Sequence, residues 1–461
     1  MNTRFQLLLI LLSVAGISLL SCGGDDVDPV PLFEGNLVLE SQEAVNEAGR
    51  LAHVEITGNL VISDSEEDGT TLITDLSALS TITTITGDLI VHETIQLTNL
   101  NGLDNLEEIG GAVTITENRE LRQFDALRGV TRYTEPRVRV FDNLSLLSIS
   151  GLQGLTIARS LEVTNCYNLV NLDGLQNLQG VNGEVRFIGI SGVTSVRELS
   201  NLRYTGDFLL AGDNINGLAG LTALDSVAGT LRVEFFENMT DLSDLSGVSY
   251  INSLFVTNNR NMTSLRGMTS LRSLPGEIKI ENCPQLVDLQ GLEMVTTSQA
   301  IQINQNDNLT SLNGLGNLQS VNDLSLFENL KLRDLSALSN LGIIFNKLVI
   351  QDNNQLSGLQ GLEGLTSVDD MVILRNGILS NIDALGNIRT MSDIFFANNP
   401  ALTNLDAFQN LEQMERFSAN GNINLNDFCG VANVDFRVSY VALNNGFNPS
   451  LDDLESGNCR Q

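Results

Sequence analysis

Residues 312–329 read Leu-Asn-Gly-Leu-Gly-Asn-Leu-Gln-Ser-Val-Asn-Asp-Leu-Ser-Leu-Phe-Glu-Asn, and this order of positions recurs along most of the chain. Successive units begin 22 to 25 residues apart, and only the last spacing is shorter, at 20. A fixed period of this length indicates stacked units, none of which can bury its apolar side chains alone. The sequence therefore predicts a solenoid. The units begin at Leu76, Leu100, Phe124, Ile149, Leu172, Val196, Leu218, Leu242, Leu265, Leu289, Leu312, Leu335, Leu359, Ile382, Leu405 and Leu425.

Each unit contains a short segment of alternating apolar and polar residues, for which Gly87–Val91 is an example. The period of two predicts a β-strand in which Leu89 and Val91 point into the core while Ile90 points outward. Seventeen such segments lie between residues 35 and 419. At about 4.8 Å between neighbouring strands, they would form a rod roughly 80 Å long.

A second regular feature is a small polar residue three positions after the second inward side chain of each strand. A buried Asn at this position can bond the backbone of the next turn, where the strand bends and leaves polar groups free. One such residue per turn makes a ladder, and Cys is small enough to take the same place. For the two cysteines we favour this packing role over a redox or metal role. The predicted ladder comprises Asn118, Asn143, Cys166, Asn259, Cys283, Asn306, Asn329, Asn353, Asn399 and Asn422.

The consensus Leu-x-x-Val-x-Gly-x-Leu-x-Ile-x-x-Asn/Cys resembles a leucine-rich repeat and is most similar to the receptor L domain. The resemblance extends from residue 35 to about residue 428 and implies an all-β, right-handed parallel β-solenoid of about 17 turns of 22–25 residues. It is specific for the fold but not for a function, since such folds serve adhesins, receptors and wall proteins alike.

Both ends of the predicted solenoid domain, residues 35–428, require caps. We expect an N-terminal cap at residues 35–57, with a short amphipathic helix near Ser41–Asn46, and a C-terminal cap at residues 429–461. Cys429 and Cys459 delimit the C-terminal segment, and in an oxidising compartment they could close it with a disulfide.

The first 21 residues have the features of a signal peptide, with Arg4 before an apolar run from Phe5 to Leu20. Leu19-Leu20-Ser21-Cys22 resembles the lipobox of bacterial lipoproteins, which implies cleavage before Cys22 and acylation of that residue. Residues 22–34 would then be an acidic tether, similar to the export tag of Bacteroidetes-type surface lipoproteins. We therefore predict a lipid-anchored protein of the outer membrane that faces the cell exterior; an ordinary secretory signal is the alternative.

The charge and the scarce histidines exclude several functions. The net charge of −31 disfavours nucleic acid as a partner, because the acidic protein and the phosphate backbone would repel each other. The chain has only two histidines, His53 and His92, so a histidine-based triad or a multi-histidine metal site is out of reach. Adjacent acidic residues such as Asp369 and Asp370 point to opposite faces of a strand and make a poor catalytic pair. We expect no enzyme activity, no cofactor and no metal site, with calcium in an acidic turn left open.

The outward residues of the strands provide the candidate binding site. An apolar stretch on adjacent turns usually marks a contact surface, although β-propensity alone also places Val and Ile there. Farther towards the N-terminus the outward residues include four basic ones, Arg139, Arg186, Arg232 and Lys279, with Glu162, Glu184, Glu234 and Glu277 nearby. For these we favour charge pairing across strands over ligand binding. The candidate site comprises Val349, Ile373 and Phe395, flanked by Phe327 and Met371.

Three functions fit these observations. The leading hypothesis is a non-enzymatic, lipid-anchored surface protein whose strand face binds an unknown protein or surface polymer, for adhesion or ligand capture. The alternative is a polysaccharide-binding or polysaccharide-cleaving β-helix lipoprotein of a nutrient-uptake system, against which stand the absent Trp and the five Tyr. The third is a structural spacer of the envelope. The leading hypothesis predicts that replacing Phe395 and Ile373 by Ser abolishes binding without changing thermal stability.

Overall fold

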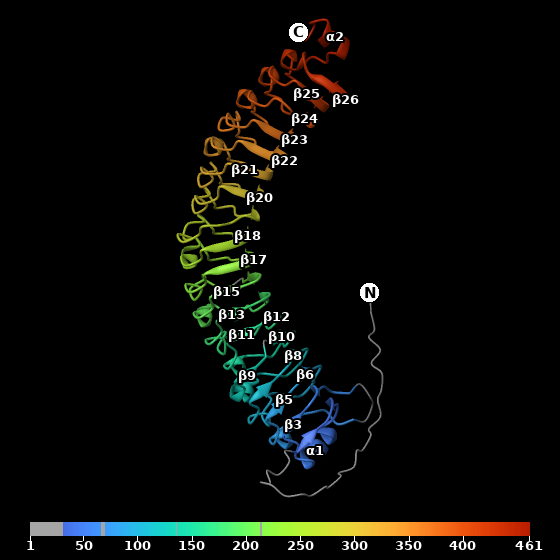
Figure 1. Cartoon of the computed structure of the whole chain (residues 1–461), viewed down its shortest axis with the longest axis vertical. Coiled ribbons are helices and arrows are strands. Elements are labelled where there is room, and N and C mark those ends of the chain that lie inside the picture. Colours follow the sequence, from blue (N-terminus) through green and yellow to red (C-terminus); the bar gives the residue numbers. More distant parts are fainter. Residues whose placement is uncertain (1–30, 66–69, 135, 213) are drawn as a thin grey trace, which may run out of the picture.

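The chain is a curved stack of short coils. The computed structural model describes residues 31–65, 70–134, 136–212 and 214–461. Within these ranges it forms a parallel β-solenoid of about 18 turns, which confirms the predicted all-β solenoid. Figure 1 shows that the stack bends into an arc, with the main sheet along its concave side. The curvature was not predictable from the repeat.

The main sheet contributes one strand per turn, and each strand pairs in parallel with those of the neighbouring turns. Seventeen of its strands end at or before Asn420, and one more follows inside the predicted C-terminal cap. The strands are β2 (Leu37–Leu39), β4 (Leu60–Ile62), β6 (Leu89–His92), β8 (Val113–Thr116), β10 (Arg137–Phe141), β12 (Ser160–Thr164), β14 (Val185–Ile188), β16 (Phe208–Ala211), β17 (Ser226–Glu234), β18 (Tyr250–Thr257), β19 (Glu277–Glu281), β20 (Thr297–Asn304), β21 (Ser320–Phe327), β22 (Ile343–Gln351), β23 (Ser367–Leu374), β24 (Asp393–Ala397), β25 (Gln413–Asn420) and β26 (Asp435–Leu443).

A second row of two-residue strands precedes the main strands in the N-terminal half and merges into the long strands from β17 onward. These strands are β1 (Leu32–Phe33), β3 (Glu55–Ile56), β5 (Thr84–Ile85), β7 (Glu108–Ile109), β9 (Arg132–Tyr133), β11 (Ile157–Ala158), β13 (Gly180–Val181) and β15 (Tyr204–Thr205). Many turns also contain a short 3₁₀ helix, namely η1 (Ser77–Leu79), η2 (Asp125–Gly129), η3 (Ser150–Leu152), η4 (Arg197–Leu199), η5 (Ser243–Leu245), η6 (Ser336–Leu338), η7 (Asp383–Leu385), η8 (Asp406–Phe408) and η9 (Cys429–Val431).

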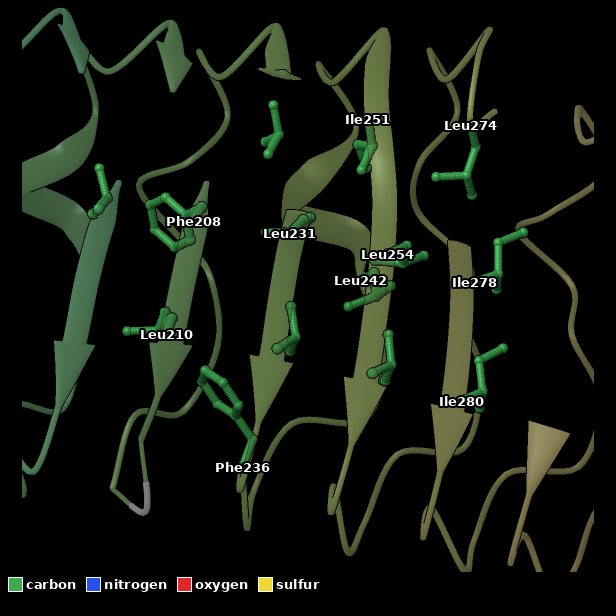
Figure 2. Packing of buried hydrophobic residues seen from close by; sticks show 14 of the residues in the cluster. Phe208, Leu210, Leu231, Phe236, Leu242, Ile251, Leu254, Leu274, Ile278 and Ile280 are labelled. Carbon is green, nitrogen blue, oxygen red and sulfur yellow. The ribbon is translucent and has the colours of Figure 1, made fainter. Parts of the chain in front are cut away.

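One continuous core runs through the stack, because each inward side chain packs against its equivalents in the turns before and after. Figure 2 shows this for Leu210, Leu231, Leu254 and Ile278, which point into the space enclosed by the coils. Burial of each such side chain is worth about 1.5–3 kcal/mol. A narrow interior filled mostly by aliphatic residues explains why the chain uses no Trp.

The predicted ladder residues are all buried, and the asparagines among them link successive turns by hydrogen bonds. The side chain of Asn353 donates to the carbonyl of Leu326 at 2.8 Å, and its Oδ1 accepts the backbone N–H of Asn329 at 3.1 Å. Asn376 belongs to the same ladder, although it was not among the predicted residues. The residue before each of these positions has a left-handed backbone, as at Asp352 and Arg375, and this bends the chain out of the strand. The longest unbroken run is Asn306, Asn329, Asn353, Asn376, Asn399, Asn422 and Asn445.

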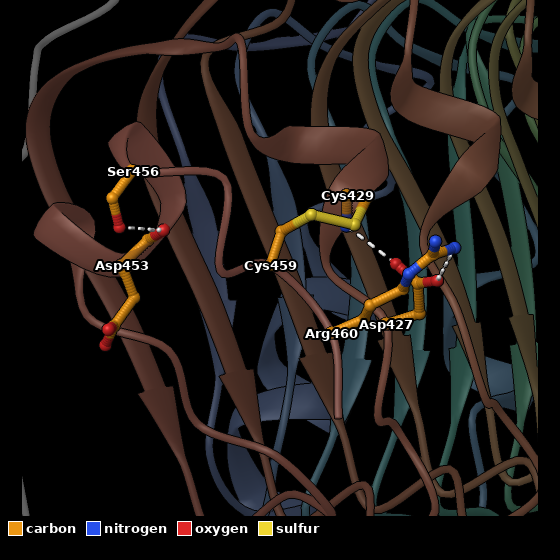
Figure 3. Close-up of a disulfide and its surroundings, with 6 residues drawn as sticks. All are labelled: Asp427, Cys429, Asp453, Ser456, Cys459 and Arg460. Atoms are coloured by element: carbon orange, nitrogen blue, oxygen red, sulfur yellow. Dashed lines mark hydrogen bonds and ion pairs between the residues drawn. A yellow bond between two sulfur atoms is a disulfide. The ribbon is translucent and has the colours of Figure 1, made fainter.

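Short helices cover both ends of the core. Helix α1 (Gln42–Arg50) buries Val45 and Ala48 against the first turn, close to where the sequence predicts a helix. Helix α2 (Leu451–Glu455) buries Leu454 at the other end. Cys429 and Cys459 form a disulfide with 4.9 Å between their Cα atoms, and Figure 3 shows it beside the ion pair of Asp427 and Arg460. The last coil is therefore fixed to the turn before it.

Candidate functional site

A single file of outward side chains runs down the middle of the concave sheet. Strand pairing aligns Val349 with Val372, Val372 with Phe395, Phe395 with Ser418, and Ser418 with Val441. Because directly aligned residues of paired strands lie closest on a sheet face, the first three form a contiguous apolar stripe. We call Val349, Val372 and Phe395 the concave stripe.

Two of the predicted site residues do not belong to this surface. Ile373 and Met371 are buried, at 0% and 1% exposure, so their predicted places on or beside the outward face are wrong. In β23 the alternation places Met371 and Ile373 in the core and Val372 outside. The prediction was displaced by one residue, which moves a side chain to the opposite face of a strand. The same displacement hid Asn376, which lies three residues after the inward Ile373.

The concave stripe is accessible along its length. Phe395 is 38% exposed, and Val349 and Val372 are partly exposed. Val441, beyond Ser418 in the same file, is 36% exposed. Phe327, also predicted for the site, is partly exposed in the next outward file, where it aligns with Gln351. A shallow depression of about 270 Å³ lies at the stripe and is lined in part by Val372, Phe395 and Val441.

A row of charged residues borders the stripe on the side where the strands begin. Strand pairing aligns Lys347, Asp370, Asp393 and Arg416 in this order. Arg416 binds Asp393 with 2.8 Å between Nη1 and Oδ2. Burial raises the pKa of Asp370, and the nearby carboxylates of Asp393 and Asp369 raise it further. The stripe therefore has a polar border, the usual arrangement around an apolar contact patch.

The four outward basic residues farther along the sheet are paired with acids, which confirms charge pairing but corrects its geometry. Only Arg139 pairs across strands, with 3.2 Å between its Nε and Oε2 of Glu162. The other three each pair with an acidic residue two positions away in the same turn, and Lys279 binds Glu281 rather than Glu277. Arg139 and Arg232 also lie over the rings of Phe141 and Phe255, at 4.9 and 4.5 Å. The remaining pairs are Arg186 with Glu184 and Arg232 with Glu234.

The reactive side chains are dispersed or buried. His53 and His92 lie on different turns, and His92 is 3.8 Å from the Glu93 carboxylate. Burial raises the pKa of the Cys166 and Cys283 thiols to about 11, so both are protonated near neutral pH. In the described ranges, no group of three or more His, Cys, Asp or Glu residues is placed to hold a metal ion.

The predicted signal peptide, the acylated Cys22 and most of the tether fall within residues 1–30, outside the described residues. No helix in the part of the chain that the structure describes has both the length and the apolar character needed to cross a bilayer.

Comparison with known proteins supports the domain type. The family model for the receptor L domain matches residues 54–156, from β3 to the start of β11. No match to a curated protein is found. A solved structure described as "Crystal structure of TLR13-ssRNA13 complex" is 13% identical, with 92% of this chain and 82% of that chain covered and a TM-score of 0.28. The match over residues 54–156 supports a repeat of the receptor L type.

Proposed function

We propose that this protein is a non-enzymatic, lipid-anchored surface protein that binds a protein or a surface polymer through its concave sheet, for adhesion or ligand capture. The observation that carries the proposal is the concave stripe, formed by Val349, Val372 and Phe395. These side chains project from a rigid sheet whose backbone groups are already paired. Three adjacent apolar side chains facing solvent lower the free energy of any complex that covers them.

The paired charges elsewhere on the sheet support this location. A basic residue that already binds a carboxylate, as Arg139 binds Glu162, gains little from an anionic partner. The apolar stripe has no such internal partner. We therefore place the contact at the C-terminal half of the concave face, rather than along the central charged strands.

A binding screen tests the proposal. Residues 31–461 contain every described strand and the whole core, and this segment would be tested against immobilised envelope proteins, matrix proteins and surface polymers. The Val372→Ser and Phe395→Ser double variant should lose binding to the captured partner. The matched control replaces Tyr167 and Val170, which are 48% and 59% exposed outside the sheet, and should bind normally. Equal binding by both variants would exclude the stripe, and absence of any partner would favour a spacer.

Lipid anchoring has a separate test. Acylation depends on a Cys at position 22, where the lipobox-like sequence ends. The full chain, expressed in a bacterium that makes lipoproteins, should incorporate labelled fatty acid and sediment with outer membranes. The Cys22→Ser variant should do neither. Label retained in that variant would disprove anchoring through this residue.

A further inference from the structure

The turn of β22 contains a local expansion that its neighbours lack. Ile344 and Leu348, both buried, are four residues apart, whereas the equivalent Val321 and Leu324 of the preceding turn are three apart. The extra residue appears as a register shift between Ile344 and Lys347 on pairing with β23. Such a bulge redirects a side chain away from the sheet. Here it presents Phe345, which is 60% exposed, more than any other described aromatic residue.

The bulge is held in place by its neighbour. Earlier turns with the same four-residue step carry a glycine at the equivalent of Asn346, because a Cβ there would collide with side-chain or backbone atoms of the preceding turn. A Cβ on Gly229, for example, would lie 2.2 Å from Oδ1 of Asp207. At β22 the side chain of Asn346 instead donates to Oδ1 of Asp323 at 2.6 Å. Phe345 therefore projects from a fixed backbone. The equivalent glycines are Gly58, Gly87, Gly111, Gly183, Gly229 and Gly276.

Shallow depressions lie on both sides of the Phe345 ring. One has a volume of about 410 Å³ and is lined in part by Gln299, Ser320 and Asn322. The other has a volume of about 400 Å³ and is lined in part by Ser367 and Thr390. Together they form a groove beside the concave sheet, with the aromatic ring at its centre.

The groove follows the solenoid axis. Strand pairing aligns Thr297, Ser320, Ile343 and Ser367 in one file, and a bridge continues the line from Thr390 to Gln413. Ile343 is 37% exposed and lies two residues before Phe345, so both project from the same side of their strand. At about 4.8 Å per turn the line is roughly 24 Å long. Its shape suits an extended chain rather than a compact ligand.

The depression shared with the preceding turns has no charged residue in its lining, whereas Asp369, Glu415 and Arg437 also line the other one. Free amides and hydroxyls beside carboxylates favour a ligand that is rich in hydroxyl groups and carries no negative charge. Gln299, Ser320 and Asn322 are uncharged and can both donate and accept, and their side chains make no hydrogen bond to another described residue. Asparagines at another position of the repeat are engaged: the side chains of Asn317 and Asn340 each donate to a carbonyl of the turn before. The amide and hydroxyl groups of Gln299, Ser320 and Asn322 are therefore available to a ligand.

Two other polymers fit less well. An extended peptide gains its affinity from unpaired strand edges, and here each strand is already paired on both sides. An anionic polymer would be repelled by a chain of net charge −31. We propose that the groove centred on Phe345 binds a neutral linear oligosaccharide, with one sugar ring stacked on the phenyl ring and its hydroxyl groups bonded to the flanking amides and hydroxyls. This surface is separate from the concave stripe, so the two proposals can fail independently.

The absence of Trp provides a direct test. Phe345→Trp places a single indole in the groove, and its emission should shift in a saturable manner when short linear oligomers of glucose, mannose or xylose are added. The probes would also be titrated calorimetrically against unaltered residues 31–461. Phe345→Ala should weaken binding about tenfold, the loss expected for one aromatic contact.

Matched controls separate this site from the concave one. Phe395→Ser removes another exposed phenylalanine, which lies on the concave stripe, and should leave sugar binding unchanged. A neutral extended peptide of similar length should not shift the emission. The proposal is overturned if no sugar shifts the indole emission, if Phe345→Ala binds as tightly as the unaltered chain, or if only the peptide binds.

Discussion

Replacing the buried Asn353 by Ala should strongly destabilise the solenoid without changing its exposed surface. Asn353 is fully buried, and its side-chain amide donates to the carbonyl of Leu326 at 2.8 Å. Its Oδ1 accepts the backbone N–H of Asn329 at 3.1 Å. Alanine leaves that carbonyl and that N–H buried without partners. Each orphaned group costs about 1–3 kcal/mol, so we expect a loss of about 4 kcal/mol in the free energy of unfolding.

Two further substitutions at Asn353 test whether lost hydrogen bonds, rather than lost side-chain volume, cause the destabilisation. Cysteine should restore much of the lost stability, because Cys283 holds the same place in its own turn, with Sγ 3.7 Å from the carbonyl of Val256. Aspartate keeps the shape but loses the amide donor and buries a charge. A buried carboxyl has a raised pKa, so the Asp variant should be most stable at low pH and lose stability as the pH rises.

Urea unfolding followed by far-ultraviolet circular dichroism measures these differences. The expected order of stability at neutral pH is Asn, Cys, Ala, Asp. The reasoning is refuted if Ala costs less than about 1 kcal/mol, or if Cys costs as much as Ala. Either result would mean that water or relaxation of the turn satisfies the groups that Asn353 binds.

Three further predictions follow from the described contacts. Burial raises the pKa of Cys166 and Cys283 from 9.0 to about 11, so the neutral thiols favour the folded state. The free energy of unfolding should therefore fall by on the order of 2 kcal/mol per thiol as the pH rises from about 9 to about 11. A variant with Asn at both positions should lose less stability over the same pH range. Cys429→Ser should destabilise the last coil by roughly 3–4 kcal/mol, measurable as faster amide exchange there, because the disulfide closes a loop with a separation of 30 residues. Ile373→Ser should lower the free energy of unfolding by about 3 kcal/mol or more, whereas the outward Val372→Ser should change it by less than about 1 kcal/mol in urea titrations.

The fold was predictable because the repeat constrains it many times over. Each turn repeats the same inward positions, so an error in one turn is corrected by its neighbours. The asparagine ladder was predictable for the same reason, since a polar residue recurring at a core position needs a recurring partner. The curvature was not predictable, because it depends on small differences in packing between the two sides of each coil. The pattern of residue types in the repeat does not specify these differences.

The outward residues of the sheet were predictable only in part, because the outward face depends on single residues. Phe395 and Val349 were placed correctly, but reading β23 one residue late exchanged Val372 for the buried Ile373. Val368 and Met371 are three residues apart, as are Val321 and Leu324 two repeats earlier but not Ile344 and Leu348 of the intervening repeat, and this spacing would have corrected the assignment. A sheet face is therefore read most safely from the inward positions that repeat, with the outward ones assigned last.

The four-residue steps show where this fold leaves the sequence free to acquire a function. At most of these steps the first inserted residue is small or polar and glycine follows it, as in Thr57-Gly58 and Asn182-Gly183. The core sets the inward residues, whereas the first inserted residue is not buried at any of these steps, so packing in the core does not fix its identity. At β22 that residue is Phe345, and the glycine is replaced by Asn346, which binds Asp323. An exposed aromatic side chain supported by a compensating hydrogen bond contributes nothing to the core, so a role in binding is its most economical explanation.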